Sequence, residues 1–171
     1  PGEIQDRAQH INFQYISFVQ SDWIWLIVAA PLLGAVLNGL LTLASTGARK
    51  PMAPALYSTI ACGAAILSFL ASWFTFLHFK TLPEGSTLTQ DLFNWIDAGS
   101  FHVRMNFELD ALSITMIVFV TFISSLIHLY SVGYMKGDPG LGRYFAYLNF
   151  FLFSMLVLVM VWHARGRVGA L

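Results

Sequence analysis

Four long apolar stretches constrain this chain more than any other feature of its sequence. They cover residues 23–44, 55–79, 111–135 and 144–162, and none of them contains Asp, Glu, Lys or Arg. An α-helix needs about 20 apolar residues to cross a hydrocarbon core ~30 Å thick. We therefore predict an all-α membrane protein with four transmembrane helices over these ranges.

The composition excludes most classes of soluble protein. Hydrophobic residues make up 57% of the chain and charged residues 11%, whereas a soluble globular domain carries about 25% charged residues. Nine basic residues balance nine acidic ones, so no basic surface is available for a nucleic-acid backbone. We expect the lipid bilayer as a partner and no nucleic acid.

The cysteine and histidine contents predict no metal site. The chain has one cysteine, Cys62, which excludes a disulfide framework and a zinc or iron–sulfur site built from cysteines. Its five histidines are never three or four residues apart, so no helical pair of metal ligands is present in the sequence.

The loop charges predict the orientation in the membrane. The loop between the first two spans and the loop between the last two are short and basic; their charged residues are Arg49, Lys50, Lys136, Asp138 and Arg143. Residues 1–22 and 80–110 together hold three basic and eight acidic residues. Because basic loops stay in the cytoplasm, we expect an extracytoplasmic leader over residues 1–22. Arg165 and Arg167 would lie on the outer side, so the charge density of the short loops decides this orientation.

The segment 80–110 is the one long connection between spans. Residues 97–100 (Asp-Ala-Gly-Ser) are typical of a turn, and apolar residues alternate after it at Phe101, Val103, Met105 and Phe107. Alternation around a turn is the pattern of a β-hairpin. We expect an extracytoplasmic β-hairpin loop here.

The third span carries a polar stripe at helical spacing. The positions at this spacing are Asp110, Ser113, Ile117, Thr121, Ser124, His128 and Ser131, and all but Ile117 are polar. One interpretation is a hydrated proton path with His128 as a relay, since the ordinary pKa of histidine is about 6.5. The other is close helix packing, which Ser, Thr and His also favour in membranes. The proton-path candidates are Asp110 and His128, and we predict no catalytic residue in this chain.

Small and amide residues in the other spans indicate close helix packing. The first span has Ala35 and Gly39 four residues apart, with Asn38 between them, and the second has Ala61 and Ala65. In the fourth, Asn149 and Ser154 are the uncharged polar residues of note, and we expect both to serve in packing. Small residues at this spacing let helix backbones approach each other.

Several sequence runs, in order, resemble one family of membrane proteins. They are Phe93-Asn94-Trp95-Ile96, Phe107-Glu108-Leu109-Asp110-Ala111-Leu112-Ser113, His128-Leu129-Tyr130-Ser131-Val132-Gly133-Tyr134-Met135 and the run from Asn149 to Leu156. Over about residues 23–160 the chain resembles the N-terminal region of the largest antiporter-like subunit of respiratory complex I. This subunit is subunit L of bacterial NADH-quinone oxidoreductase, the counterpart of mitochondrial chain 5.

The resemblance implies the N-terminal part of a membrane-arm subunit that couples quinone reduction to proton movement. It implies no redox cofactor in this chain, with quinone, FMN and iron–sulfur clusters in other subunits. Other membrane-arm subunits would be its partners, in the inner (plasma) membrane with the N-terminus outside. The family's pumping residues lie on later helices, so the chain alone is not expected to be catalytic.

The family's pattern is lost at the end of the chain, and related functions remain open. Instead of a further apolar helix with a Trp-Glu-Gly element, residues 163–171 read His-Ala-Arg-Gly-Arg-Val-Gly-Ala-Leu, which we expect to be an aberrant or truncated tail. The alternative functions are the large subunit of a multisubunit Na⁺/H⁺ antiporter, a membrane-bound hydrogenase subunit, or a non-catalytic membrane scaffold.

Overall fold

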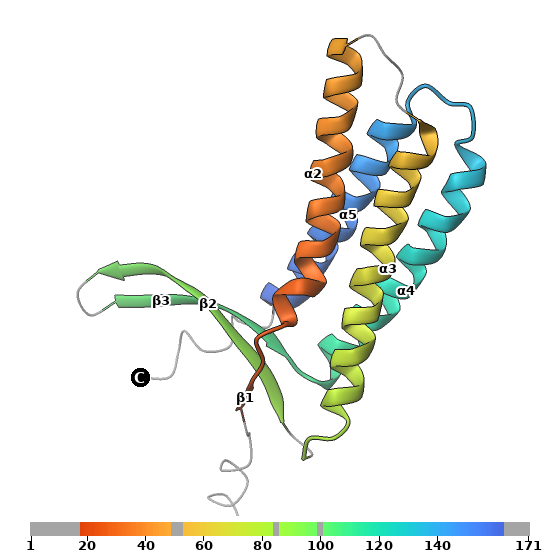
Figure 1. The fold of residues 1–171 in the computed structure, drawn as a ribbon. Helices are drawn as coiled ribbons and strands as arrows, with labels where there is room; N and C mark the ends of the chain where they lie inside the picture. The colour runs from red at the N-terminus through yellow and green to blue at the C-terminus, as the bar shows by residue number, and fades with distance from the viewer. Residues whose placement is uncertain (1–17, 49–52, 84–85, 99–100, 163–171) are drawn as a thin grey trace, which may run out of the picture.

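The protein is a bundle of four long helices with a small β-sheet at one end (Figure 1). The computed structural model describes residues 18–48, 53–83, 86–98 and 101–162. The elements in order are β1 (Phe18–Gln20), α2 (Ile24–Ala48), α3 (Pro54–Phe79), β2 (Thr87–Ala98), β3 (Phe101–Leu109), α4 (Ala111–Tyr134) and α5 (Leu141–Trp162). The expected tail at 163–171 and residues 1–17 of the expected leader lie outside the described residues.

Each of the four helices is long and apolar enough to cross a membrane; the qualifying stretches are Ile24–Gly47, Pro54–Phe79, Ala111–Tyr134 and Leu141–Met160. Two helix ends differ from the sequence prediction by more than one residue. Helix α2 continues to residue 48 instead of 44, and α5 begins at Leu141 instead of residue 144. The prediction started the fourth span after Arg143 to keep charge out of the bilayer. Arg143 instead lies exposed in the first turns of α5, where a long basic side chain can reach water.

The helix starts have local causes in the sequence. Helix α3 begins with Pro54, whose missing N–H costs nothing in the first turn of a helix. Helix α4 begins after Asp110, whose carboxylate accepts a hydrogen bond from the backbone N–H of Ser113 at 2.7 Å. Such a cap satisfies one of the donors that a helix start leaves open.

The helices pack so that α2 contacts both α3 and α5, and α3 contacts α4 (Figure 1). The main apolar core joins the first turns of α2 to the C-terminal half of α5, and it includes Ile24, Ile27, Leu152, Leu156 and Met160. The core continues into the sheet through Leu88, Phe107 and Leu109, all of which are buried. The sheet is therefore attached to the bundle by side-chain packing as well as by the chain itself.

The sheet has three strands in the order β1-β2-β3. Strands β2 and β3 pair antiparallel from Leu88↔Leu109 to Ala98↔Phe101, with register irregularities at 91–93 and 94–96. The sequence analysis placed a hairpin in this segment, but it did not include the short strand β1. Residues 18–20 pair parallel with residues 87–89 of β2. Part of the expected leader is thus built into the fold.

Candidate functional site: a buried polar seam between the helices

Polar side chains run through the interior of the bundle, and we call this set the polar seam. Its members are Asn38, Ser68, Ser72, Thr75, Thr121, Ser125, His128, Ser131 and Asn149. Each is at most 6% exposed. Among the described residues, none of the buried polar side chains is Asp, Glu, Lys or Arg. The interior that the structure describes is therefore polar but carries no fixed charge.

Most hydroxyls of the polar seam on α4 donate to the carbonyl one turn earlier. Thr121 donates to Ile117 O at 2.8 Å and Ser125 donates to Thr121 O at 2.8 Å. Ser125 also lies 3.2 Å from Ala65 O on α3, which links the two helices. These bonds satisfy the hydroxyls without water, as expected of polar residues that mediate helix packing.

The predicted polar stripe on α4 is buried, except that one predicted serine is less buried than the serine next to it. Ser113, Thr121, His128 and Ser131 are buried as the spacing predicts, but Ser125 replaces Ser124 as the deeply buried serine. Ser124 and Ser125 flank the same face of the helix, and only the position of α3 decides which of them is covered.

His128 is the most distinctive residue of the polar seam. Its Nδ1 lies 2.8 Å from the carbonyl oxygen of Ser124, so in the neutral ring Nδ1 carries the hydrogen and Nε2 is an acceptor. The ring stacks on Phe145 of α5 with centroids 6.4 Å apart and an interplanar angle of 25°. The imidazole is completely buried.

Asn149 of α5 lies beside His128 and interacts with its ring. Its amide nitrogen donates to Phe145 O at 3.2 Å. Neither Oδ1 of Asn149 nor Nε2 of His128 has a hydrogen-bond partner within the described part of the chain. An acceptor left unpaired in a buried site costs about 1–3 kcal/mol, so these two atoms are the least satisfied polar groups beside the His128 ring.

Asn149 also lies close to α2, at a point where α2 packs tightly against α3. A Cβ atom on Gly34 of α2 would lie 3.1 Å from Cγ of Asn149 and 2.6 Å from Cβ of Ala64 on α3. One turn further along α2, the amide of Asn38 donates to Tyr57 O of α3 at 3.4 Å. Oδ1 of Asn38 is a third buried acceptor with no partner among the described residues. The polar seam thus joins all four helices.

The structure does not bring the two proton-path candidates together. Asp110 caps the start of α4, whereas His128 lies near its end, roughly 27 Å away at 1.5 Å per residue. Helix capping is a sufficient reason for an acidic residue at position 110, and it requires no role for Asp110 in proton transfer. The neighbour that His128 does have, Asn149, was interpreted from the sequence as packing polarity. No local signal indicates that it faces His128, because the two are on different helices.

Residues 95–145 match the family model described as NADH-Ubiquinone oxidoreductase (complex I), chain 5 N-terminus. This range contains β3, all of α4 and the start of α5, and so includes His128.

Relatives from fungi, algae and bacteria match a larger part of the chain. NADH-ubiquinone oxidoreductase chain 5 of Podospora anserina is 35% identical over 135 residues, which is 78% of this chain and 19% of the relative. The chain 5 protein of Chondrus crispus is 37% identical over 136 residues, covering 78% and 19%. NADH-quinone oxidoreductase subunit L of Pseudomonas aeruginosa is 41% identical over 106 residues, covering 61% and 17%.

The chain thus spans about a fifth of the length of these relatives. The matched family model and the relatives agree on one family, and the range of the family model includes all of α4 and the start of α5. Over its matched residues, this chain belongs to the family of complex I chain 5 and its bacterial counterpart, subunit L.

Proposed function

We propose that this chain is the N-terminal four-helix part of a membrane-arm subunit of a proton-translocating NADH:quinone oxidoreductase. The observation that carries the proposal is the match to chain 5 over 78% of the chain at 35% identity. The Na⁺/H⁺ antiporter and hydrogenase alternatives are not favoured, because the relatives described above are named as complex I subunits.

In this proposal the bundle supports a neighbouring proton channel and does not itself move protons through charged residues. A membrane pump needs intramembrane ionisable groups, and the buried interior described here contains no Asp, Glu, Lys or Arg. Quinone, FMN and iron–sulfur clusters would belong to other subunits of the complex, and the other membrane-arm subunits would be its partners.

The proposed location is the inner (plasma) membrane, with the short basic loops in the cytoplasm. The N-terminal end and the β1–β3 sheet would then lie on the extracytoplasmic side. Support comes from the positive-inside rule, applied to the four basic residues in or next to the two short connections between helices. The sheet lies at the opposite end of the bundle (Figure 1).

A chimera tests the assignment. The matched segment of subunit L in Pseudomonas aeruginosa would be replaced by that of this chain, and NADH oxidation and quinone-dependent proton uptake would be measured in inverted vesicles. We expect both activities to be restored. The control chimera carries four helices of an unrelated membrane protein and should not assemble. Stable insertion of the first chimera without complex assembly would contradict the proposal.

One observation favours a second, chemical role for His128. Its buried Nε2 has no hydrogen-bond partner among the described residues, and its ring interacts with Asn149. In this role a water molecule bound at Nε2 would relay a proton. In the chimera, His128→Asn retains a donor near Ser124 O but cannot titrate. A relay predicts fewer protons per electron at an unchanged rate of quinone reduction. A packing role predicts that both quantities change together with assembly, or that neither changes.

A further inference from the structure

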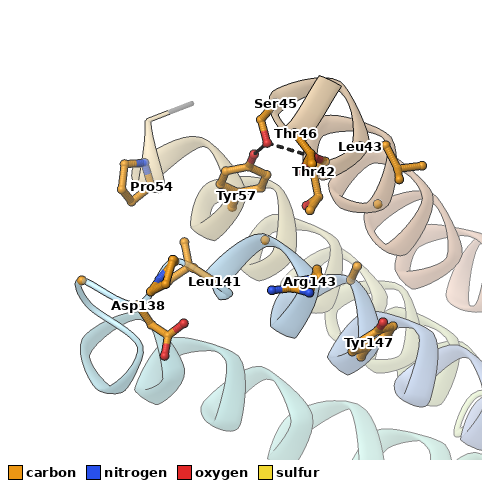
Figure 2. Close-up of a pocket in the computed structure, with 15 residues that line it drawn as sticks. Thr42, Leu43, Ser45, Thr46, Pro54, Tyr57, Asp138, Leu141, Arg143 and Tyr147 are labelled. Carbon is orange, nitrogen blue, oxygen red and sulfur yellow. Dashed lines mark hydrogen bonds between the residues drawn. The ribbon is translucent and has the colours of Figure 1, made fainter. Parts of the chain in front are cut away.

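A groove of about 780 Å³ opens at the end of the bundle opposite the sheet. Four segments form it: the last turns of α2, the first turn of α3, the turn at residues 137–140 and the first turns of α5 (Figure 2). The polar seam does not line it, so the groove is separate from the candidate site described above.

Of the described residues that line the groove, Arg143 is the one with a cationic side chain. It lies on the α5 side, with Tyr57, Thr42 and Ser45 opposite (Figure 2). Arg143 is exposed, and no ion pair or hydrogen bond engages its side chain within the described residues. A guanidinium presents five N–H donors in a planar fork that suits a phosphate group.

The groove also contains an acidic residue, Asp138, which forms a hydrogen bond within the turn before α5. Oδ1 of Asp138 accepts a hydrogen bond from the backbone N–H of Gly140 at 2.6 Å, which shapes the turn before α5. Among the described residues that line the groove, the charged side chains are Arg143 and Asp138, one of each sign. Because one oxygen of Asp138 is held by the turn, Arg143 is the charged group of the lining that can contact an anionic ligand.

The side walls of the groove are apolar where they continue along the helices. Leu43 of α2 and Tyr147 of α5 line it and are 72% and 71% exposed. Both belong to helices that qualify as membrane spans. A ligand that fits would place an anionic group at Arg143 and an apolar part beside Leu43 and Tyr147, which is the chemistry of a phospholipid and not of a soluble nucleotide.

We propose that this groove binds the headgroup of an anionic phospholipid, with Arg143 contacting the phosphate and the acyl chains lying along α2 and α5. Basic pockets between transmembrane helices are suited to anionic headgroups. This inference does not depend on the proposed role in complex I.

The test uses the full chain in nanodiscs of phosphatidylcholine with increasing phosphatidylglycerol, with retained lipid counted by native mass spectrometry. We expect one phosphatidylglycerol to be retained more tightly than the rest. Arg143→Gln should weaken its retention about fivefold, the effect of one basic residue near a membrane surface, and Arg143→Lys should restore much of it. Lys136→Gln is the matched control, because it removes the same charge from an exposed residue that does not line the groove.

Two outcomes would overturn the proposal. Equal loss of phosphatidylglycerol from Arg143→Gln and Lys136→Gln would mean that general surface charge attracts the lipid. Full displacement of the lipid by millimolar inorganic phosphate would show a simple anion site in place of a lipid site.

Discussion

At the scale of single residues, Gly34 sets how closely α2 approaches α3 and α5. A Cβ atom there would lie 2.6 Å from Cβ of Ala64, and neither atom could turn away. We expect Gly34→Ala to lower the free energy of unfolding by about 1–3 kcal/mol, the usual cost of overpacking. Reversible unfolding in mixed micelles would measure it.

Gly63 provides the matched control for Gly34. It lies in α3, and a Cβ atom on it would meet no atom within 4 Å. Gly63→Ala should therefore stabilise the protein by up to about 1 kcal/mol through helix propensity. If Gly34→Ala were equally harmless, the close approach of α2 and α3 described here would be wrong.

Two substitutions of Asp110 distinguish its role as a helix cap from a role in proton transfer. Asp110→Ala removes the acceptor for Ser113 N–H and should cost about 1 kcal/mol of stability. Asp110→Asn retains a capping oxygen and should change stability by only a few tenths of a kcal/mol. In the chimera described above, proton uptake should also survive Asp110→Asn. Loss of uptake in a stable Asp110→Asn complex would show that the carboxylate takes part in proton transfer.

At the scale of helices, one hydrogen bond between hydroxyls joins α4 to α5. Ser131 donates to Ile127 O at 2.7 Å, so Tyr144 is the donor of the 2.9 Å bond between their hydroxyl oxygens. A double-mutant cycle with Ser131→Ala and Tyr144→Phe should give a coupling energy of about 0.6 kcal/mol, the average for such bonds in membranes.

Ser154 supplies the control for this cycle. It is an exposed serine on α5 whose hydroxyl bonds to Phe150 O one turn earlier. Ser154→Ala should show no coupling to Tyr144→Phe. Equal coupling in the two cycles would mean that the α4–α5 contact does not depend on the Ser131–Tyr144 bond.

The elements also differ in how far the sequence could predict them. The helices were predicted to within a few residues, because apolar length and capping residues act locally. Strand β1 was missed because residues 18–20 pair with residues 87–89, and three residues give no periodic signal. The burial of Ser125 in place of Ser124 likewise depends on a neighbouring helix and not on the spacing along α4.

At the scale of the whole molecule, the orientation in the membrane can be tested by chemical labelling. Thr81 and Lys136 are exposed residues in turns after α3 and α4, at opposite ends of the bundle. With a membrane-impermeant maleimide, Thr81→Cys should react in intact cells and Lys136→Cys should react in inverted vesicles, because basic loops stay in the cytoplasm.

The native cysteine gives an internal reference for this labelling. Cys62 is a buried residue of α3, so the unsubstituted chain should label slowly from either side. The reverse pattern for the two introduced cysteines would place the sheet in the cytoplasm and overturn the proposed orientation.

The sequence by itself determined the membrane class, the number of spans and the positions of the polar residues along each helix. These properties follow from local composition, since the transfer of a helix into a bilayer depends on its own length and side chains. Only the tertiary structure decided which helices face one another. It placed Asn149 against Gly34 and beside His128, joined β1 to β2, and opened the groove at Arg143, because each of these contacts joins segments that are distant in the sequence.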